Sequence, residues 1–316
     1  MRWKVLILFF VAKISFSQDV HFSQNFVDRI NFNPSLVGDL SENDFRVSII
    51  RKSQWQSVSV PFSTLSSSFE GKEIYKKLNI GLQFLNDQSG SSKLTHNQFN
   101  IAISRKFNVN RYNSLSLGLF TGLGQKTIDY SELLFEEQEF FITDNFMFAD
   151  IGFGTNYSTN IQEKLSYNVG FSFYHINTPS ISFIQDETVS LPIKNNYNFG
   201  VNYRFNSKTN LKSEIIISKQ STQKEILIGI RPSIDFEEFI LFPIAFYRVN
   251  DAAIFGVGMQ KNNFFGNISY DINVSDLQNA SNNKSGFEFS LIYKWKKKKK
   301  KKKQIKDIKE KCPEYL

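Results

Sequence analysis

Three histidines and one cysteine are the side chains of this chain most able to bind a metal or attack a substrate. Their spacing therefore indicates whether the chain has a metal site or a catalytic site. His21, His96 and His175 lie in separate stretches, without the Glu-x-x-His or His-x-x-x-His spacing of a helical metal site. Cys312 is the only cysteine, so it has no intramolecular disulfide partner and lacks the companions of a zinc site. The sequence predicts isolated polar histidines and a free thiol, with no metal and no cofactor.

Serine-based catalysis and nucleotide binding are equally poorly supported. Ser172 and His175 are three residues apart, which places them on opposite faces of a strand, and no nucleophile elbow surrounds the serine. No Gly-x-x-x-x-Gly-Lys-Ser/Thr loop or dinucleotide fingerprint is present. We therefore expect no catalytic residue and no enzyme activity.

The elements that carry these residues alternate between apolar and polar positions. In Gly286–Trp295, aromatic and aliphatic side chains occupy every second position, while Glu288, Ser290 and Lys294 occupy the other face, which is interrupted only by Ile292. A period of two indicates a β-strand. Such strands are predicted at 45–53, 63–70, 78–86, 95–106, 113–124, 146–158, 164–174, 195–206, 209–218, 223–232, 238–249, 251–261, 263–273 and 285–295.

Export and strand length favour a membrane barrel over a water-soluble sheet. Arg2 and Lys4 precede the apolar run 5–12, and Ser15 and Ser17 suit signal-peptidase cleavage before Gln18. The mean hydropathy is −0.30 although aromatics make up 15% of the chain, as expected of strands with one apolar face. The sequence predicts an all-β, antiparallel outer-membrane barrel of about 14 strands. A soluble exported β-domain is the alternative.

The net charge of +8 belongs to the C-terminal tail. Residues 294–316 hold twelve Lys and three acidic residues, a net of +9, which leaves −1 for the rest of the chain. A basic nucleic-acid-binding face on the body is thereby disfavoured. The tail has three interpretations: a solvated extension, a ligand for acidic periplasmic partners or peptidoglycan-associated proteins, or a contact with anionic membrane.

The expected organisation is a signal peptide at 1–17, a lead-in or plug segment at 18–44, a barrel at 45–295 and a lysine-rich tail at 296–316. Connections after even-numbered strands are mostly short, whereas three after odd-numbered strands are long. Outer-membrane barrels keep short turns in the periplasm and long loops outside. Both termini are therefore expected in the periplasm, with Tyr293 and Trp295 at the periplasmic interface.

Short motifs are distributed along the mature chain: Phe22, Ser23 and Gln24; Asn33, Pro34 and Gly38; Arg51, Gln54 and Trp55; Pro179 and Pro192; and Cys312 with Pro313. In combination they resemble the PorP/SprF family of the type IX secretion and gliding machinery. We take these residues as candidates for family-specific structure or partner contact.

The resemblance implies an outer-membrane barrel that aids the secretion or surface anchoring of adhesins. Its implied partners are a secreted adhesin with a type IX sorting domain, the type IX translocon, periplasmic tethering proteins and outer-membrane lipid, with no nucleic acid. The alternative is a FadL-like or porin-like transporter of small molecules, in which residues 18–44 plug the lumen.

Overall fold

A computed structural model describes residues 19–54, 62–90, 94–129, 144–162, 164–183, 189–275 and 284–297. The predicted signal peptide, Trp55, and the tail beyond Lys297 with Cys312 and Pro313 lie outside the described residues. No helix in the described part of the chain is long and apolar enough to cross a membrane.

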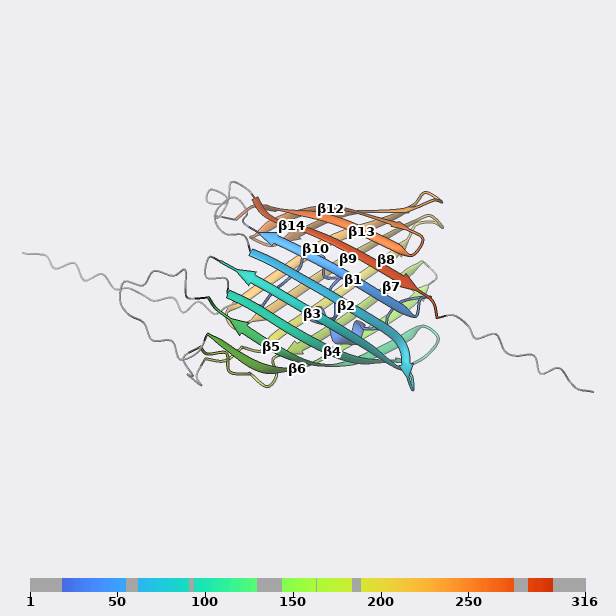
Figure 1. Cartoon of the computed structure of the whole chain (residues 1–316). Helices are drawn as coiled ribbons and strands as arrows, with labels where there is room; N and C mark the ends of the chain where they lie inside the picture. The colour runs from blue at the N-terminus through green and yellow to red at the C-terminus, as the bar shows by residue number, and fades with distance from the viewer. Residues whose placement is uncertain are drawn as a thin grey trace, which may run out of the picture.

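Fourteen antiparallel strands form one closed barrel, in which each strand pairs with its neighbours in sequence (Figure 1). All fourteen predicted strands are confirmed. They are β1 (Phe45–Gln54), β2 (Phe62–Tyr75), β3 (Leu78–Ser89), β4 (Leu94–Asn108), β5 (Asn113–Thr127), β6 (Asn145–Gln162), β7 (Leu165–Tyr174), β8 (Lys194–Arg204), β9 (Thr209–Gln220), β10 (Gln223–Asp235), β11 (Ile240–Arg248), β12 (Ala252–Lys261), β13 (Phe264–Asn273) and β14 (Lys284–Trp295).

The barrel closes between its first and last strands. β1 and β14 pair antiparallel over their whole shared length, from Phe45 opposite Trp295 to Gln54 opposite Gly286. Lipid offers no hydrogen bonds to an unpaired strand edge, so closure satisfies the backbone that an open sheet would leave exposed.

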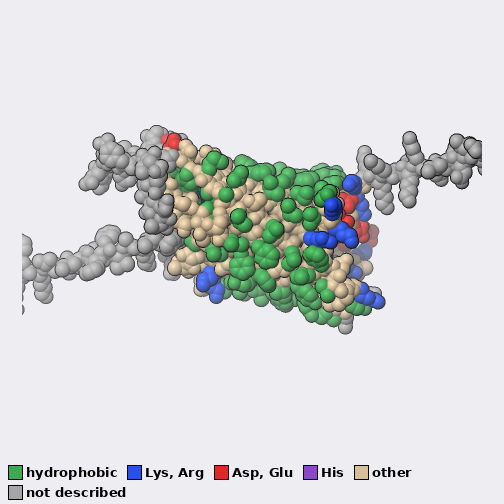
Figure 2. Space-filling model, turned by 90° about the horizontal axis from the view of Figure 1, so that it is seen from below, with side chains coloured by type: hydrophobic (Ala, Val, Ile, Leu, Met, Phe, Trp, Pro, Cys, Tyr) green, Lys and Arg blue, Asp and Glu red, His purple; other side chains and the backbone are tan. Residues whose placement is uncertain are grey.

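The two faces of the sheet have opposite chemistry. Phe287, Phe289 and Leu291 of β14 point outward and are exposed, whereas Glu288 and Ser290 between them are buried in the interior. The same alternation on the other strands makes a broad hydrophobic surface, and charged side chains gather at one end of the barrel (Figure 2). An apolar exterior with a polar interior is the reverse of a soluble β-domain and suits a barrel in lipid.

The two ends of the barrel differ in their connections. The end where β14 finishes, here called the turn end, carries connections of two or four residues, such as 76–77 and 205–208. The opposite end, the loop end, carries the long connections 128–144, 175–193 and 274–283. At the turn end, Trp295 stacks on Phe45 and Tyr293 with ring centroids 5.3 Å apart in both pairs. This outward aromatic cluster has the character of a membrane-interface girdle.

Replacing Leu119 by arginine should test whether this exterior faces lipid. Leu119 is 64% exposed near the middle of β5, where an arginine in hydrocarbon costs ~2–4 kcal/mol. Tyr75→Arg, at the turn end of β2, is the matched control and should cost at most about 1 kcal/mol. The measurement is denaturant unfolding of both variants in lipid vesicles. Equal costs at the two positions would argue against a membrane-embedded exterior.

Candidate functional site

Residues 19–44, here called the lumenal segment, run through the inside of the barrel to its turn end, where Ser41 and Glu42 are exposed. Their only regular elements are a helical turn, α1 (Arg29–Phe32), and a 3-10 turn, η1 (Pro34–Leu36). Figure 1 shows α1 and η1 in blue behind the front strands. Phe22 and Val27 pack against Ile50, Leu85 and Ile292, which point inward from the strands. The apolar interruption at Ile292 is therefore the contact surface for this segment.

Glu288 of β14 is the main polar anchor of the lumenal segment. Its two carboxylate oxygens accept hydrogen bonds from the backbone N–H groups of Ser23 at 2.7 Å and Gln24 at 3.0 Å. The Lys52 ammonium lies 3.6 Å from the same carboxylate and donates a hydrogen bond to the His21 carbonyl. The segment thus supplies backbone partners to two charges that are almost fully buried.

The side chains of Ser23 and Gln24 also form hydrogen bonds with the barrel wall. The Ser23 hydroxyl donates to Asp271 at 2.9 Å and accepts from the Arg248 guanidinium at 2.6 Å. The Gln24 amide donates to Ser269 at 2.9 Å, and its carbonyl oxygen accepts from Ser290 at 2.6 Å. Ser23 and Gln24 are therefore hydrogen-bonded by side chains of β11, β13 and β14 together.

A second ion pair holds the turn-end half of the segment. Arg46 of β1 pairs with Glu70 of β2, and both are fully buried. Arg46 also donates to the Val27 carbonyl at 2.6 Å, and Glu70 accepts from the Gly38 N–H at 3.0 Å. Gly38 has φ +75°, a conformation that side chains disfavour, and a Cβ there would lie 2.4 Å from Asn79.

Asn33, Pro34 and Ser35 are fitted into a hollow of the barrel wall. The Asn33 side chain accepts from the Ser35 N–H at 3.0 Å and donates to the Thr155 carbonyl at 3.1 Å. Gly118 of β5 makes room for this turn, because a Cβ there would lie 2.4 Å from the Pro34 carbonyl carbon. The wall and the turn are complementary in shape at this point.

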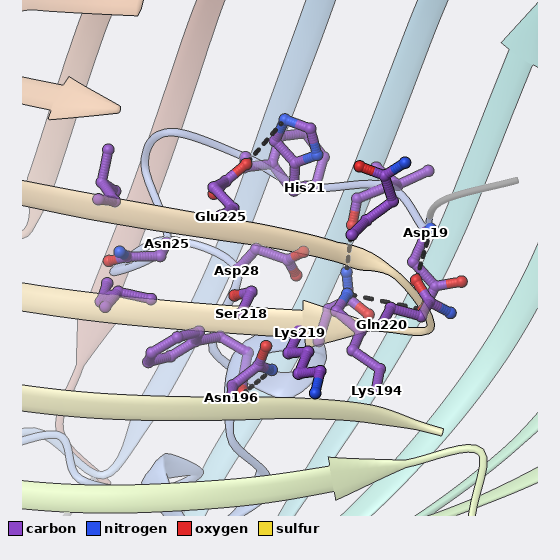
Figure 3. A pocket seen from close by; sticks show the side chains of 17 residues that line it. Asp19, His21, Asn25, Asp28, Lys194, Asn196, Ser218, Lys219, Gln220 and Glu225 are labelled. Carbon is purple, nitrogen blue, oxygen red and sulfur yellow. Dashed lines mark hydrogen bonds and ion pairs between the residues drawn. The ribbon is translucent and has the colours of Figure 1, made fainter. Parts of the chain in front are cut away.

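Asp19, Asp150, His175 and Lys194 form a charged cluster at the loop end, here called the loop-end latch. Asp19 lies 2.5 Å from His175 Nε2 and 3.6 Å from Lys194 Nζ, and His175 Nδ1 lies 3.0 Å from Asp150. Figure 3 shows Asp19 and Lys194 beside a small cavity of about 70 Å³, where His21 also contacts Glu225. The latch ties the start of the lumenal segment to the barrel rim.

The latch favours the protonated form of His175. Burial by itself would lower the pKa of this histidine, but the carboxylates of Asp19 and Asp150 outweigh it and raise the pKa to about 9. Burial would raise the pKa of Asp19, but His175 and Lys194 outweigh it and hold that pKa well below its usual 3.8. At neutral pH His175 is therefore a cation between the carboxylates of Asp19 and Asp150.

The structure brings together six of the predicted motif residues and separates the others from them. Phe22, Ser23, Gln24, Asn33, Pro34 and Gly38 all belong to the lumenal segment and are buried. Arg51 and Gln54 lie at the loop end of β1, where Arg51 faces outward and is exposed. The Pro179 carbonyl accepts from the Leu191 N–H at 2.9 Å, and the Pro192 carbonyl accepts from Gln220 at 3.3 Å. Partner contact by any of them stays a prediction.

Sequence reasoning missed the charged partners of the segment, and its expectation of isolated histidines was wrong for His21 and His175. His175 and Asp19 are 156 positions apart in sequence, so no local spacing could reveal the pair. A usable signal existed at Glu288, a carboxylate flanked by Phe287 and Phe289. Such a charge faces the interior and requires a partner there.

Chemically, this arrangement binds the N-terminal segment to the barrel wall. No group of three His, Cys, Asp or Glu side chains in the described ranges could hold a metal ion. Glu288, Glu70 and His175 each hold the chain's own N-terminal segment.

A closed barrel with an apolar exterior, a polar interior and short turns at one end defines an outer-membrane β-barrel protein. The chain belongs to the PorP/SprF family: the family model described as type IX secretion system membrane protein PorP/SprF matches residues 14–293. The family and the fold neighbours are secretion and transport barrels rather than enzymes. No curated protein matches the sequence.

Solved structures share the fold at low sequence identity. The Ralstonia pickettii toluene transporter TbuX is 9% identical, with a TM-score of 0.56 over 85% of this chain and 93% of its own. A Pseudomonas aeruginosa FadL homologue is 8% identical, with a TM-score of 0.52 over 83% of this chain and 92% of its own. The P. putida toluene transporter TodX is 6% identical, with a TM-score of 0.50 over 84% and 92%. These values establish a shared outer-membrane barrel fold.

Glu288→Gln should loosen the lumenal segment. An amide keeps the size of the side chain but has one acceptor oxygen, so a buried N–H of Ser23 or Gln24 loses its partner and Lys52 loses its counter-charge. We expect a loss of about 3 kcal/mol, seen as faster hydrogen exchange at residues 20–27. Glu237→Gln, which breaks an exposed pair with Lys208, is the control and should change nothing measurable. Unchanged exchange in Glu288→Gln would contradict the anchor.

Gly118→Ala should displace η1. The new methyl group would overlap the backbone at Pro34 and Ser35, which cannot move aside as a flexible side chain could. We expect a loss of ~1–3 kcal/mol in unfolding free energy and greater protease access to residues 30–40. Gly266→Ala adds the same methyl group 3.4 Å from Leu291 and should be tolerated. Similar behaviour of the two variants would exclude a tight fit at η1.

The loop-end latch should weaken at alkaline pH. A raised histidine pKa means that its stabilisation is complete below pH 6.5 and is lost as the pH rises through about 9. The difference in unfolding free energy between the wild type and His175→Gln should follow this course. Asp19→Asn should flatten it, because the main partner charge is gone. A difference that persists unchanged above pH 9 would show that His175 does not titrate with the latch.

Proposed function

We propose that this PorP/SprF barrel acts as a non-enzymatic component of type IX secretion that aids the secretion or surface anchoring of adhesins. The observation that carries the proposal, beside the family, is that the lumen is occupied by the chain's own N-terminal segment. Backbone N–H groups of that segment donate hydrogen bonds to the buried carboxylates of Glu288 and Glu70, which are themselves paired with Lys52 and Arg46 of the wall. A lumen sealed in this way suits a docking scaffold better than an open pore.

The proposed orientation places the turn end in the periplasm. It is supported by the short connections and the aromatic cluster at that end, and by the long connections at the other. Cleavage after Ser17 would leave residues 18–44 as the plug, and residues 296–316 would enter the periplasm, where translocon and tethering proteins reside. The loop end would then face the secreted adhesin.

Deletion of the gene tests this function directly. Surface display of adhesins with type IX sorting domains should fall, and the wild-type gene should restore it. Complementation with Glu288→Gln should restore display only in part, because the plug is loosened. Normal display of every type IX cargo in the deletion strain would rule out the proposed role.

A transporter of small molecules is the second candidate, favoured by the fold shared with the toluene transporters TbuX and TodX. In that case the lumenal segment would have to move to open a path. Liposome swelling with the purified protein distinguishes the two functions. A scaffold should give no swelling, whereas swelling that increases in Glu288→Gln would favour transport through the lumen.

A further inference from the structure

The turn end of the lumen contains a large cavity that the lumenal segment does not fill. This cavity, here called the vestibule, has a volume of about 720 Å³. Its inner end is formed by Phe26, Arg29 and Phe32 of the lumenal segment, and its walls come from strands β4 to β14. Ligand sites in proteins commonly have volumes of ~300–1,000 Å³. The vestibule is therefore large enough for a ligand.

The vestibule carries an excess of positive charge. Five cations line it, Arg29, Lys106, Lys212, Arg231 and Lys294, with two acidic residues, Asp39 and Glu214. Lys106 pairs with Asp39 at 3.4 Å and Lys212 pairs with Glu214 at 3.5 Å. Arg29 lies 3.8 Å from Glu70. Within the described part of the chain, Arg231 and Lys294 have no ion pair.

Arg231 is already oriented to receive an anion. Its guanidinium carbon lies 3.7 Å from the centre of the Phe26 ring, so the group is stacked on the lumenal segment. Stacking covers one face of a guanidinium and leaves its N–H edge available, which matches the two oxygens of a carboxylate. An anion bound there would contact both the barrel wall and the plug.

The wall that continues from the Arg231 strand, β10, is lined with amides. Asn156, Asn168, Asn198, Asn202 and Asn210 line the vestibule from four consecutive strands, β6 to β9. Each amide carries two N–H donors and an acceptor oxygen, the groups that pair with a peptide backbone. Three of them use one N–H within the wall, Asn156 to Ser158, Asn168 to Asn156 and Asn210 to Ser233. A simple anion needs the cations alone, whereas an extended peptide would use the cations and the amides together.

We propose that the vestibule is a binding site for an acidic, extended peptide segment of a partner protein. Side-chain carboxylates of the peptide pair with Arg231 and Lys294, and its backbone hydrogen-bonds to the asparagine wall. The site is defined by this chain's own residues. Only the placement of the partner in the periplasm rests on the proposed function.

The test uses the purified full-length protein in a zwitterionic detergent and a short fluorescent peptide in which Asp alternates with Gly. The Asp peptide should bind, and a peptide with Asn in place of Asp should not. Arg231→Gln and Lys294→Gln should each weaken binding about 10- to 100-fold, the effect of losing a hydrogen bond to a charged group. Lys208→Gln removes an equal charge at the turn end, outside the vestibule, and should bind as the wild type does.

Three outcomes would overturn the proposal. The Asn peptide could bind as well as the Asp peptide, or Lys208→Gln could weaken binding as much as Arg231→Gln, which would indicate general charge attraction. Inorganic phosphate or an oligogalacturonate at equal concentration could displace the peptide, which would indicate an oxyanion or glycan site. Lys294→Gln keeps the test valid if Arg231→Gln disturbs the plug. Peptide binding together with normal adhesin display in the deletion strain would refute the proposed function alone.

Discussion

A charged group buried inside a protein is stable only when it is paired, and this constraint organises the interior of the barrel. Arg46, Glu70 and Glu288 have no exposed surface, and Lys52 has almost none. Arg46 and Glu70 pair with each other, and Lys52 lies beside Glu288. The backbone of the lumenal segment supplies the remaining hydrogen-bond partners of both pairs. That segment is therefore part of the protein's polar core rather than an appendage.

The same interior shows why a membrane barrel can still possess a hydrophobic core. Lipid contact requires the outer face to be apolar, so the strands have only their inward positions left for polar residues. Where the lumenal segment touches the wall, some of those positions are apolar: Ile50, Leu85 and Ile292 receive Phe22 and Val27. The inner face is thus mainly polar, and its apolar patches lie where the lumenal segment contacts the wall.

Local periodicity predicted every strand because lipid on one face and the polar lumen on the other impose a two-residue period on most of each strand. It could not place residues 19–44, which lack a period and gain their conformation from contacts with distant strands. Glu288, set between two phenylalanines, hinted that an interior partner exists but not which one. His175 gave no hint, since Asp19 and Asp150 reach it from far along the chain. Pairing across such distances is a property of the closed fold.

The anchoring of Ser23 and Gln24 by the last strand has a consequence for biogenesis. Ser23 and Gln24 lie 265 and 264 positions before Glu288, so their anchor does not exist until the C-terminal strand has been delivered. A growing sheet that lacks β14 would have an unsealed lumen and two unpaired edges. The strand that closes the seam with β1 is therefore the same strand that supplies the Glu288 anchor of the lumenal segment.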